Sequence, residues 1–225
     1  MKKLLAVFLS LLSAAGWAGT ISVGDTVLNI PDPPGFVPLT EKMKLVYDHQ
    51  QMFVAPTNQQ FIAFVSKSDT SRLLKKDIPN LLARLFSVQM DKRLIARYFT
   101  KSEFAQLKGS IKAQHASVEL TNKIEELLEK ALSDLGQGDQ HSQMIMLPIH
   151  EETDSTLAYS AFVVGHIDNG DGVVTPHVSV FTVTLVNVKG KALFLYSTAE
   201  RNGLEWSQTI SKQWSSSVVT ANRDN

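Results

Sequence analysis

The sequence predicts an α+β fold, in which a mostly antiparallel sheet carries a C-terminal amphipathic helix on one face and further helices on the other. Two observations lead to this α/β/α sandwich-like arrangement. Three successive segments rich in β-branched and aromatic residues, separated by short turns, fill positions 157–197. Directly after them, positions 204–219 place apolar residues on one helical stripe, which can cover a sheet.

The three segments read LAYSAFVVGH, VVTPHVSVFTVTLVN and ALFLYS. Because side chains alternate along a strand, the middle segment presents apolar residues on both of its faces. One face carries Phe181, Val183 and Leu185, and the other carries Val178, Val180 and Val186. The middle segment is therefore predicted to be a central strand that is covered on both sides.

The C-terminal helix has the clearest pattern in the chain. Its apolar stripe repeats every four residues and consists of Trp206, Ile210, Trp214, Val218 and, at its end, Ala221. Serine, threonine, lysine and glutamine fill the opposite face. Asn202 is the expected N-cap, with Glu205 three residues later as in a capping box. We expect this helix to be structural.

The N-terminal half predicts shorter elements. A hairpin is expected over 21–30, a helix from Thr40 to about Gln51, and a buried strand over 60–65. The polar segment 67–80 predicts a surface loop, the second half of 81–90 a strand, and 91–98 a short helix. A short strand over 144–148, whose proline favours its end or a sheet edge, and a charged turn over 150–154 lead into the three strands described above.

A long helical region is predicted from Thr100 to about Leu135. Thr100-Lys-Ser-Glu103 forms a capping box at its start, and Gly136 and Gly138 end it. Its apolar residues form two stripes about 140° apart, which one straight helix cannot bury against one flat partner. We therefore predict a kink, a break or a change of packing partner between about Gln114 and Glu119.

The first eighteen residues resemble a secretory signal peptide. Two lysines precede an apolar run over 4–12, and small residues end the segment at Ala18. The apolar run is shorter than the about 20 residues that a spanning helix needs. We expect cleavage near Ala18, no membrane span, and a single α+β domain over 19–225 in the bacterial periplasm or secreted.

Charge and cysteine content exclude several classes of protein. The chain has 22 basic and 22 acidic residues, and removing Lys2 and Lys3 with the leader gives 20 − 22 = −2. This balance offers no electrostatic case for a nucleic acid or an anionic membrane as partner. The sequence has no cysteine, which excludes disulfides, thiolate catalysis, cysteine-based zinc sites and an N-terminal lipid anchor.

The linear signatures of common enzymes are absent. The sequence contains no G-x-S-x-G, no phosphate-binding loop, no G-x-G-x-x-G and no H-E-x-x-H. His150-Glu-Glu begins like a zinc-protease helix, but Asp154 stands where the second histidine is required. Asp168-Asn-Gly-Asp-Gly172 resembles a calcium loop in composition, yet its spacing fails and turn chemistry explains the same residues.

One hairpin register could create a metal site. If Asp171-Gly172 forms the two-residue turn, His166 stands opposite His177, with Cβ atoms about 5 Å apart. Asp168 or Glu152 could then supply a third ligand for a divalent metal. If Asn169-Gly170 forms the turn instead, His177 faces Phe162. The two registers remain open at this stage.

The overall pattern resembles a family of uncharacterised exported bacterial proteins. The residues that carry this resemblance are the leader, Pro33-Pro34-Gly35-Phe36, the stretch VKGKALFLY ending at Tyr196, Trp206, Trp214 and Ala221-Asn222. The order of elements is also loosely similar to the PsbP-like fold, an antiparallel sheet with helices on both sides. The resemblance implies a binding or accessory scaffold and supplies no site residues.

The expected function is therefore that of a non-enzymatic periplasmic or secreted binding or accessory protein, without a cofactor. Its expected partner is another envelope or secreted protein or a small ligand. The alternative is a metal-assisted hydrolase that uses residues between His150 and His177.

Overall fold

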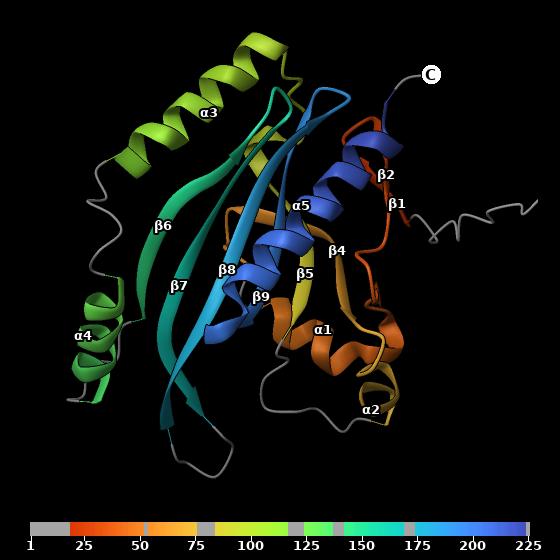
Figure 1. The fold of residues 1–225 in the computed structure, drawn as a ribbon. Coiled ribbons are helices and arrows are strands. Elements are labelled where there is room, and N and C mark those ends of the chain that lie inside the picture. The colour runs from red at the N-terminus through yellow and green to blue at the C-terminus, as the bar shows by residue number, and fades with distance from the viewer. Residues whose placement is uncertain are drawn as a thin grey trace, which may run out of the picture.

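A computed structural model describes residues 19–51, 54–75, 84–116, 124–136, 142–168 and 174–223. Seven strands form one antiparallel sheet in the order β3-β4-β5-β9-β8-β7-β6, and β1 and β2 form a separate hairpin (Figure 1). The bounds of the strands are β1 Gly19–Val23, β2 Thr26–Ile30, β3 Phe36–Pro38, β4 Asn58–Ser66, β5 Leu85–Asp91, β6 Gln143–Glu152, β7 Thr156–Asp168, β8 Val174–Val188 and β9 Lys191–Glu200. The predicted α+β class is confirmed.

The helices lie on both faces of the large sheet. Their bounds are η1 Glu41–Met43, α1 Lys44–Gln51, α2 Thr70–Leu74, η2 Lys92–Leu94, α3 Lys101–Ala116, α4 Ile124–Gly136, η3 Arg201–Gly203 and α5 Leu204–Ala221. None of the described helices is long and apolar enough to cross a membrane. Helix α2 lies in the segment 67–80, which the sequence predicted to be a surface loop. Leu73 of this helix is buried and packs with Met43 and Val46.

Helix α5 covers one face of the central strands, as its apolar stripe predicted. Trp214 and Val218 are almost fully buried and pack on Phe64 and Phe86. The Trp214 ring meets the Phe64 ring edge-on at 5.6 Å between centroids, and its Nε1 donates to the Pro31 carbonyl at 2.7 Å. The indole thus buries its ring without leaving its N–H unpaired.

Helix α5 begins differently from the prediction. Its N-cap is Gly203, which makes no side-chain cap bond, and the η3 turn precedes it. A Cβ atom at Gly203 would lie 2.6 Å from the Ala199 Cβ. Only glycine permits this close approach. Asn202 lies within η3 and does not cap the helix.

The long helical region was predicted to kink, break or change its packing partner between about Gln114 and Glu119, and residues 117–123 lie outside the described residues. Helix α3 ends at Ala116, and α4 begins at Ile124. The capping box at the start of α3 forms, since Glu103 N–H donates to Thr100 Oγ1 at 3.2 Å and the Thr100 N–H donates to the Glu103 carboxylate at 2.9 Å. The described apolar residues of the two helices contact different partners, which confirms a change of packing partner.

The two helices pack on opposite faces of the sheet. Phe104 of α3 packs with Leu157 and Leu185, whereas Leu128 of α4 packs with Val180. Leu185 and Val180 project from opposite faces of β8 because their positions differ in parity. Helix α4 therefore shares the face of α5. The sequence predicted that the helical region 102–135 covers the other face or one end of the sheet, and its second half lies instead on the α5 face.

Lys191 fixes three peripheral segments at the β8–β9 turn. Its side chain is fully buried, and Nζ donates to the carbonyls of Ile95 at 3.0 Å and Arg97 at 3.3 Å. The ammonium lies 3.8 Å from the centre of the Tyr98 ring and 3.7 Å from the Asp25 carboxylate. One cation therefore joins the β1–β2 turn, the segment after β5 and the β8–β9 turn.

Replacing Lys191 with methionine should destabilise the protein, because the apolar stem is kept while two buried carbonyls lose their charged donor. We expect the free energy of unfolding to fall by about 3 kcal/mol, measured by urea denaturation. The exposed Lys101 is the control, since its change to methionine should cost less than about 0.5 kcal/mol. Equal effects at both positions would contradict the role assigned to Lys191.

Candidate functional site

The pairing between β7 and β8 determines whether the two histidines of the predicted metal site stand opposite each other. His166 stands opposite Pro176, and His177 stands opposite Gly165. The observed pairing therefore follows neither predicted register: His166 does not face His177, and His177 does not face Phe162. The same alignment holds along the whole hairpin. The turn dipeptides at 169–172 lie outside the described residues.

This register separates the two histidines. Residues directly opposite each other share a face of an antiparallel sheet, so His177 lies on the face of Gly165 and His166 on the opposite face. The prediction that His166 and His177 face each other was therefore wrong. Asp168 is the last described residue of β7 and pairs with Val174. In the described ranges, no three His, Asp or Glu side chains are grouped closely enough to hold a metal ion.

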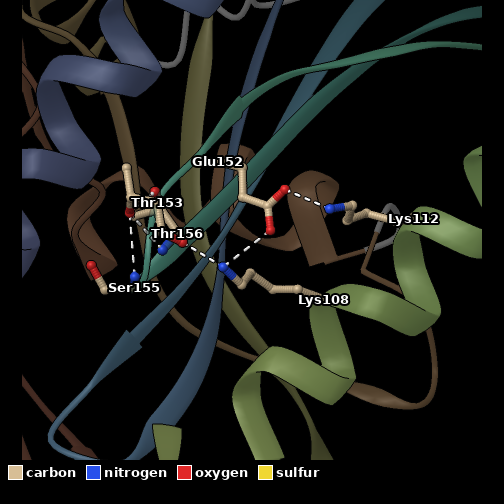
Figure 2. Close-up of polar contacts among 6 residues, drawn as sticks. All are labelled: Lys108, Lys112, Glu152, Thr153, Ser155 and Thr156. Carbon is tan, nitrogen blue, oxygen red and sulfur yellow. Dashed lines mark hydrogen bonds and ion pairs between the residues drawn. The ribbon is translucent and has the colours of Figure 1, made fainter. Parts of the chain in front are cut away.

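Glu152, the other expected ligand, is held by two lysines of α3 (Figure 2). Its carboxylate lies 3.2 Å from Lys108 Nζ and 2.8 Å from Lys112 Nζ. These side-chain hydrogen bonds lower the pKa of Glu152, with Lys112 contributing most. Lys108 also donates to the Thr153 carbonyl, so the cluster attaches α3 to the turn between β6 and β7.

The charged turn predicted over 150–154 is only partly correct. Strand β6 continues through His150 to Glu152, with register irregularities on either side of Ile149. The turn follows at Thr153, whose Oγ1 accepts hydrogen bonds from the N–H groups of Ser155 and Thr156 (Figure 2). A β-bulge allows His150 and Glu151 to remain in the strand despite Pro148.

His150 and Ser160 form a contact between an imidazole and a hydroxyl, at 3.4 Å from Nε2 to Oγ. A nucleophile must reach its substrate, but Ser160 is fully buried beneath α5. Its oxygen also accepts from the Gln208 amide at 3.4 Å and lies 2.9 Å from Thr182 Oγ1. This pair therefore has the elements of a catalytic dyad without access for a substrate.

A hollow of about 660 Å³ lies where β8 extends past the end of β9. Its apolar lining comes from α4, β7 and β8, and its polar lining comes mainly from β8, η3 and the end of β9. The lining residues are Glu125, Leu132, Phe162, Pro176, His177, Val178, Glu200, Arg201 and Asn202. Sites for small molecules commonly have a volume of this order and combine apolar walls with a few polar groups.

His177 is the predicted site residue that lines the hollow. Its Nε2 atom is buried and has no hydrogen-bond partner. Burial lowers the pKa of His177, and the Glu200 carboxylate opposes this shift. Because Nε2 has almost no accessible surface, it does not face the open hollow, which other atoms of His177 line.

The charged residues of the hollow are unequally paired. Arg201 and Glu125 form an ion pair at 2.7 Å, and the Glu125 side chain is 74% exposed. Glu200 has a longer contact, 4.0 Å to Arg84 Nε. Because Glu125 neutralises Arg201, Glu200 is the carboxylate of the hollow that is most available to a ligand.

Sequence reasoning found His177 but missed Glu200, Arg201 and the apolar wall. Phe162 and Val178 were read only as strand residues, and Leu132 belongs to a helix predicted for the other face. These residues meet because α4 crosses to the α5 face, where Leu132 packs beside Phe162 and Val178. No local sequence signal reports this crossing.

Comparisons with known proteins do not assign a family. No protein-family model matches the chain, and no curated protein is significantly similar to it. Solved structures that match include the Saccharomyces cerevisiae Ran-binding protein Mog1p, with 11% identity, 87% of each chain covered and a TM-score of 0.31. Another is cyanobacterial PsbP (CyanoP) from Synechocystis, with 11% identity, 87% of this chain and 84% of that chain covered, and a TM-score of 0.31. A PsbP protein is thus a weak structural neighbour of this chain.

The two lysines that hold Glu152 should differ in their importance for stability. The Lys108 side chain is 9% exposed and bonds a backbone carbonyl, whereas Lys112 is 50% exposed. Lys108→Met should lower the free energy of unfolding by about 2 kcal/mol, because it leaves the Thr153 carbonyl without its charged donor. Lys112→Met is the matched control and should change urea denaturation little. The idea fails if Lys112→Met is the more damaging change.

Proposed function

We propose that this protein is a non-enzymatic binding protein, exported to the periplasm or secreted after cleavage near Ala18. Its ligand would be a small molecule with an apolar body and a cationic or hydrogen-bond-donating end. One observation carries the proposal: the hollow beside the β7–β8 hairpin joins an apolar wall to an available carboxylate, that of Glu200. A cavity with these features is the usual first candidate for a binding site.

Different residues of the lining would contact different parts of the ligand. Phe162 and Val178 are themselves nearly buried and would contact an apolar body. Glu200 would attract a cationic or hydrogen-bond-donating end. An anionic ligand would meet the Glu200 carboxylate without a free cation to compensate, since Arg201 is already paired with Glu125.

Three probes with the same phenylethyl body test this preference: phenethylamine, phenethyl alcohol and 3-phenylpropionate. We expect ligand-observed NMR to rank the amine first and the carboxylate last. Glu200→Gln should weaken amine binding by about two- to fivefold, as expected for one partly exposed ion pair. The exposed Glu205, in the first turn of α5, is the control, because Glu205→Gln removes the same charge at a residue that does not line the hollow.

Failure of all three probes to bind, or equal losses in the Glu200 and Glu205 variants, would overturn the small-ligand proposal. Capture of another envelope protein that depends on Glu200 and His177 but not on Glu205 would instead identify a protein partner at this surface.

Metal content separates the proposal from the metal-assisted hydrolase that the sequence left open. We expect elemental analysis of the protein purified without chelators to find less than one divalent metal ion per chain. Removal of metal by chelation should then leave the melting temperature unchanged. A stoichiometric metal lost together with a hydrolytic activity would favour the hydrolase.

A further inference from the structure

Beneath α5, five hydroxyl groups form a continuous chain that joins the helix to three strands. The chain is Ser211, Ser197, Ser207, Thr182 and Ser160, and its oxygens lie 2.7–2.9 Å apart in succession. All five residues are at least 97% buried. At the Ser160 end, the chain reaches His150 Nε2 at 3.4 Å. Its length and burial distinguish it from an isolated hydroxyl contact.

One assigned bond sets the direction of the first half of the chain. Ser207 donates its proton to Thr182 at 2.8 Å. Because a hydroxyl has only one proton, Ser207 must accept from Ser197, and Ser197 must in turn accept from Ser211.

The second half can continue in the same direction. Thr182 then donates to Ser160, which also accepts from the Gln208 amide. The Ser160 proton is left for His150, whose Nε2 must accept it. In this arrangement every hydroxyl proton has an acceptor within the chain, and the imidazole is neutral with its own proton on Nδ1.

We propose that His150 is an acid-sensitive latch for α5: its neutral Nδ1–H form receives the hydroxyl chain, and its protonation interrupts the chain and loosens the helix. A doubly protonated imidazole is a donor at both nitrogens, so it cannot accept from Ser160. Ser160 would then have to turn its proton away, and the aligned bonds that support one another along the chain would be lost.

The charges around His150 favour its neutral form. From α5, the Lys212 ammonium faces it and also lies 3.6 Å from the Glu151 carboxylate of β6. The next carboxylate on β6, Glu152, is occupied by the lysines of α3, and β7 contributes the neutral Ser160. Burial, and after it Lys212, lowers the pKa of His150.

The sign of the pH effect follows from this shift. A histidine with a folded-state pKa below its unfolded value of about 6.5 binds more protons when unfolded, so acid favours unfolding. The contribution is complete above about pH 6.5 and is lost as the pH falls below that value. His177 also has a lowered pKa and contributes in the same window, so the two histidines must be separated experimentally.

The first test is the tautomer of His150 in the wild-type protein. Long-range ¹H–¹⁵N NMR at pH 7.5 should find the proton on Nδ1 and Nε2 unprotonated. A proton on Nε2 would mean that His150 donates to Ser160 and would overturn the latch. This measurement needs no variant and remains decisive if substitutions prevent folding.

The second test follows the protection of α5 amides by hydrogen exchange between pH 7.5 and 5, corrected for the intrinsic exchange rates. Protection of α5 should fall severalfold more than protection of β4 in the wild-type protein. His150→Gln should remove this excess loss, whereas the control His177→Gln should retain it. The latch is refuted if His150→Gln leaves the pH dependence of α5 unchanged.

Discussion

The structure depends on the register between β7 and β8, which runs unbroken from Thr156 opposite Val186 to Asp168 opposite Val174. Side chains alternate between the two faces of a strand, so this one alignment assigns every residue of the hairpin to a face. It sends Ser160 and Thr182 toward α5 and Leu157 and Leu185 toward α3. If one of the two strands slipped by one residue, its buried hydroxyl would point toward the apolar core beneath α3. The slip would also move apolar side chains out of that core.

The α5 face combines two kinds of contact in one interface. Trp214 and Val218 pack in one apolar cluster, Phe162 and Val180 belong to another, and Trp206 contacts both. The hydroxyl chain lies on the same face. Apolar burial supplies most of the attraction but has no direction. The hydroxyl chain requires defined partners, so it selects one position of α5 among those that the apolar stripe alone would permit.

Two buried lysines attach peripheral elements to the central sheet. Lys108 attaches α3 to the β6–β7 turn, and Lys191 joins the β1–β2 turn to the β8–β9 turn. In both cases the ammonium bonds a backbone carbonyl and also lies close to a carboxylate. Burying an ammonium is costly unless its donors are paired. These contacts therefore serve as attachment points for specific loops and give no indication of catalysis.

The sequence by itself determined the three-stranded meander, the extent of α5 and part of its buried face, the capping box at Thr100 and the change of packing partner between α3 and α4. These features follow from local rules: side-chain alternation, helical spacing, and the incompatibility of two stripes with one flat partner. Only the tertiary structure decided that His166 and His177 lie on opposite faces, that α4 shares the face of α5, and that Lys108 and Lys191 are buried. It also created the hollow, in which Leu132, His177 and Glu200 meet from separate segments. Such contacts depend on strand register and helix placement, which are set by packing between residues far apart in the chain.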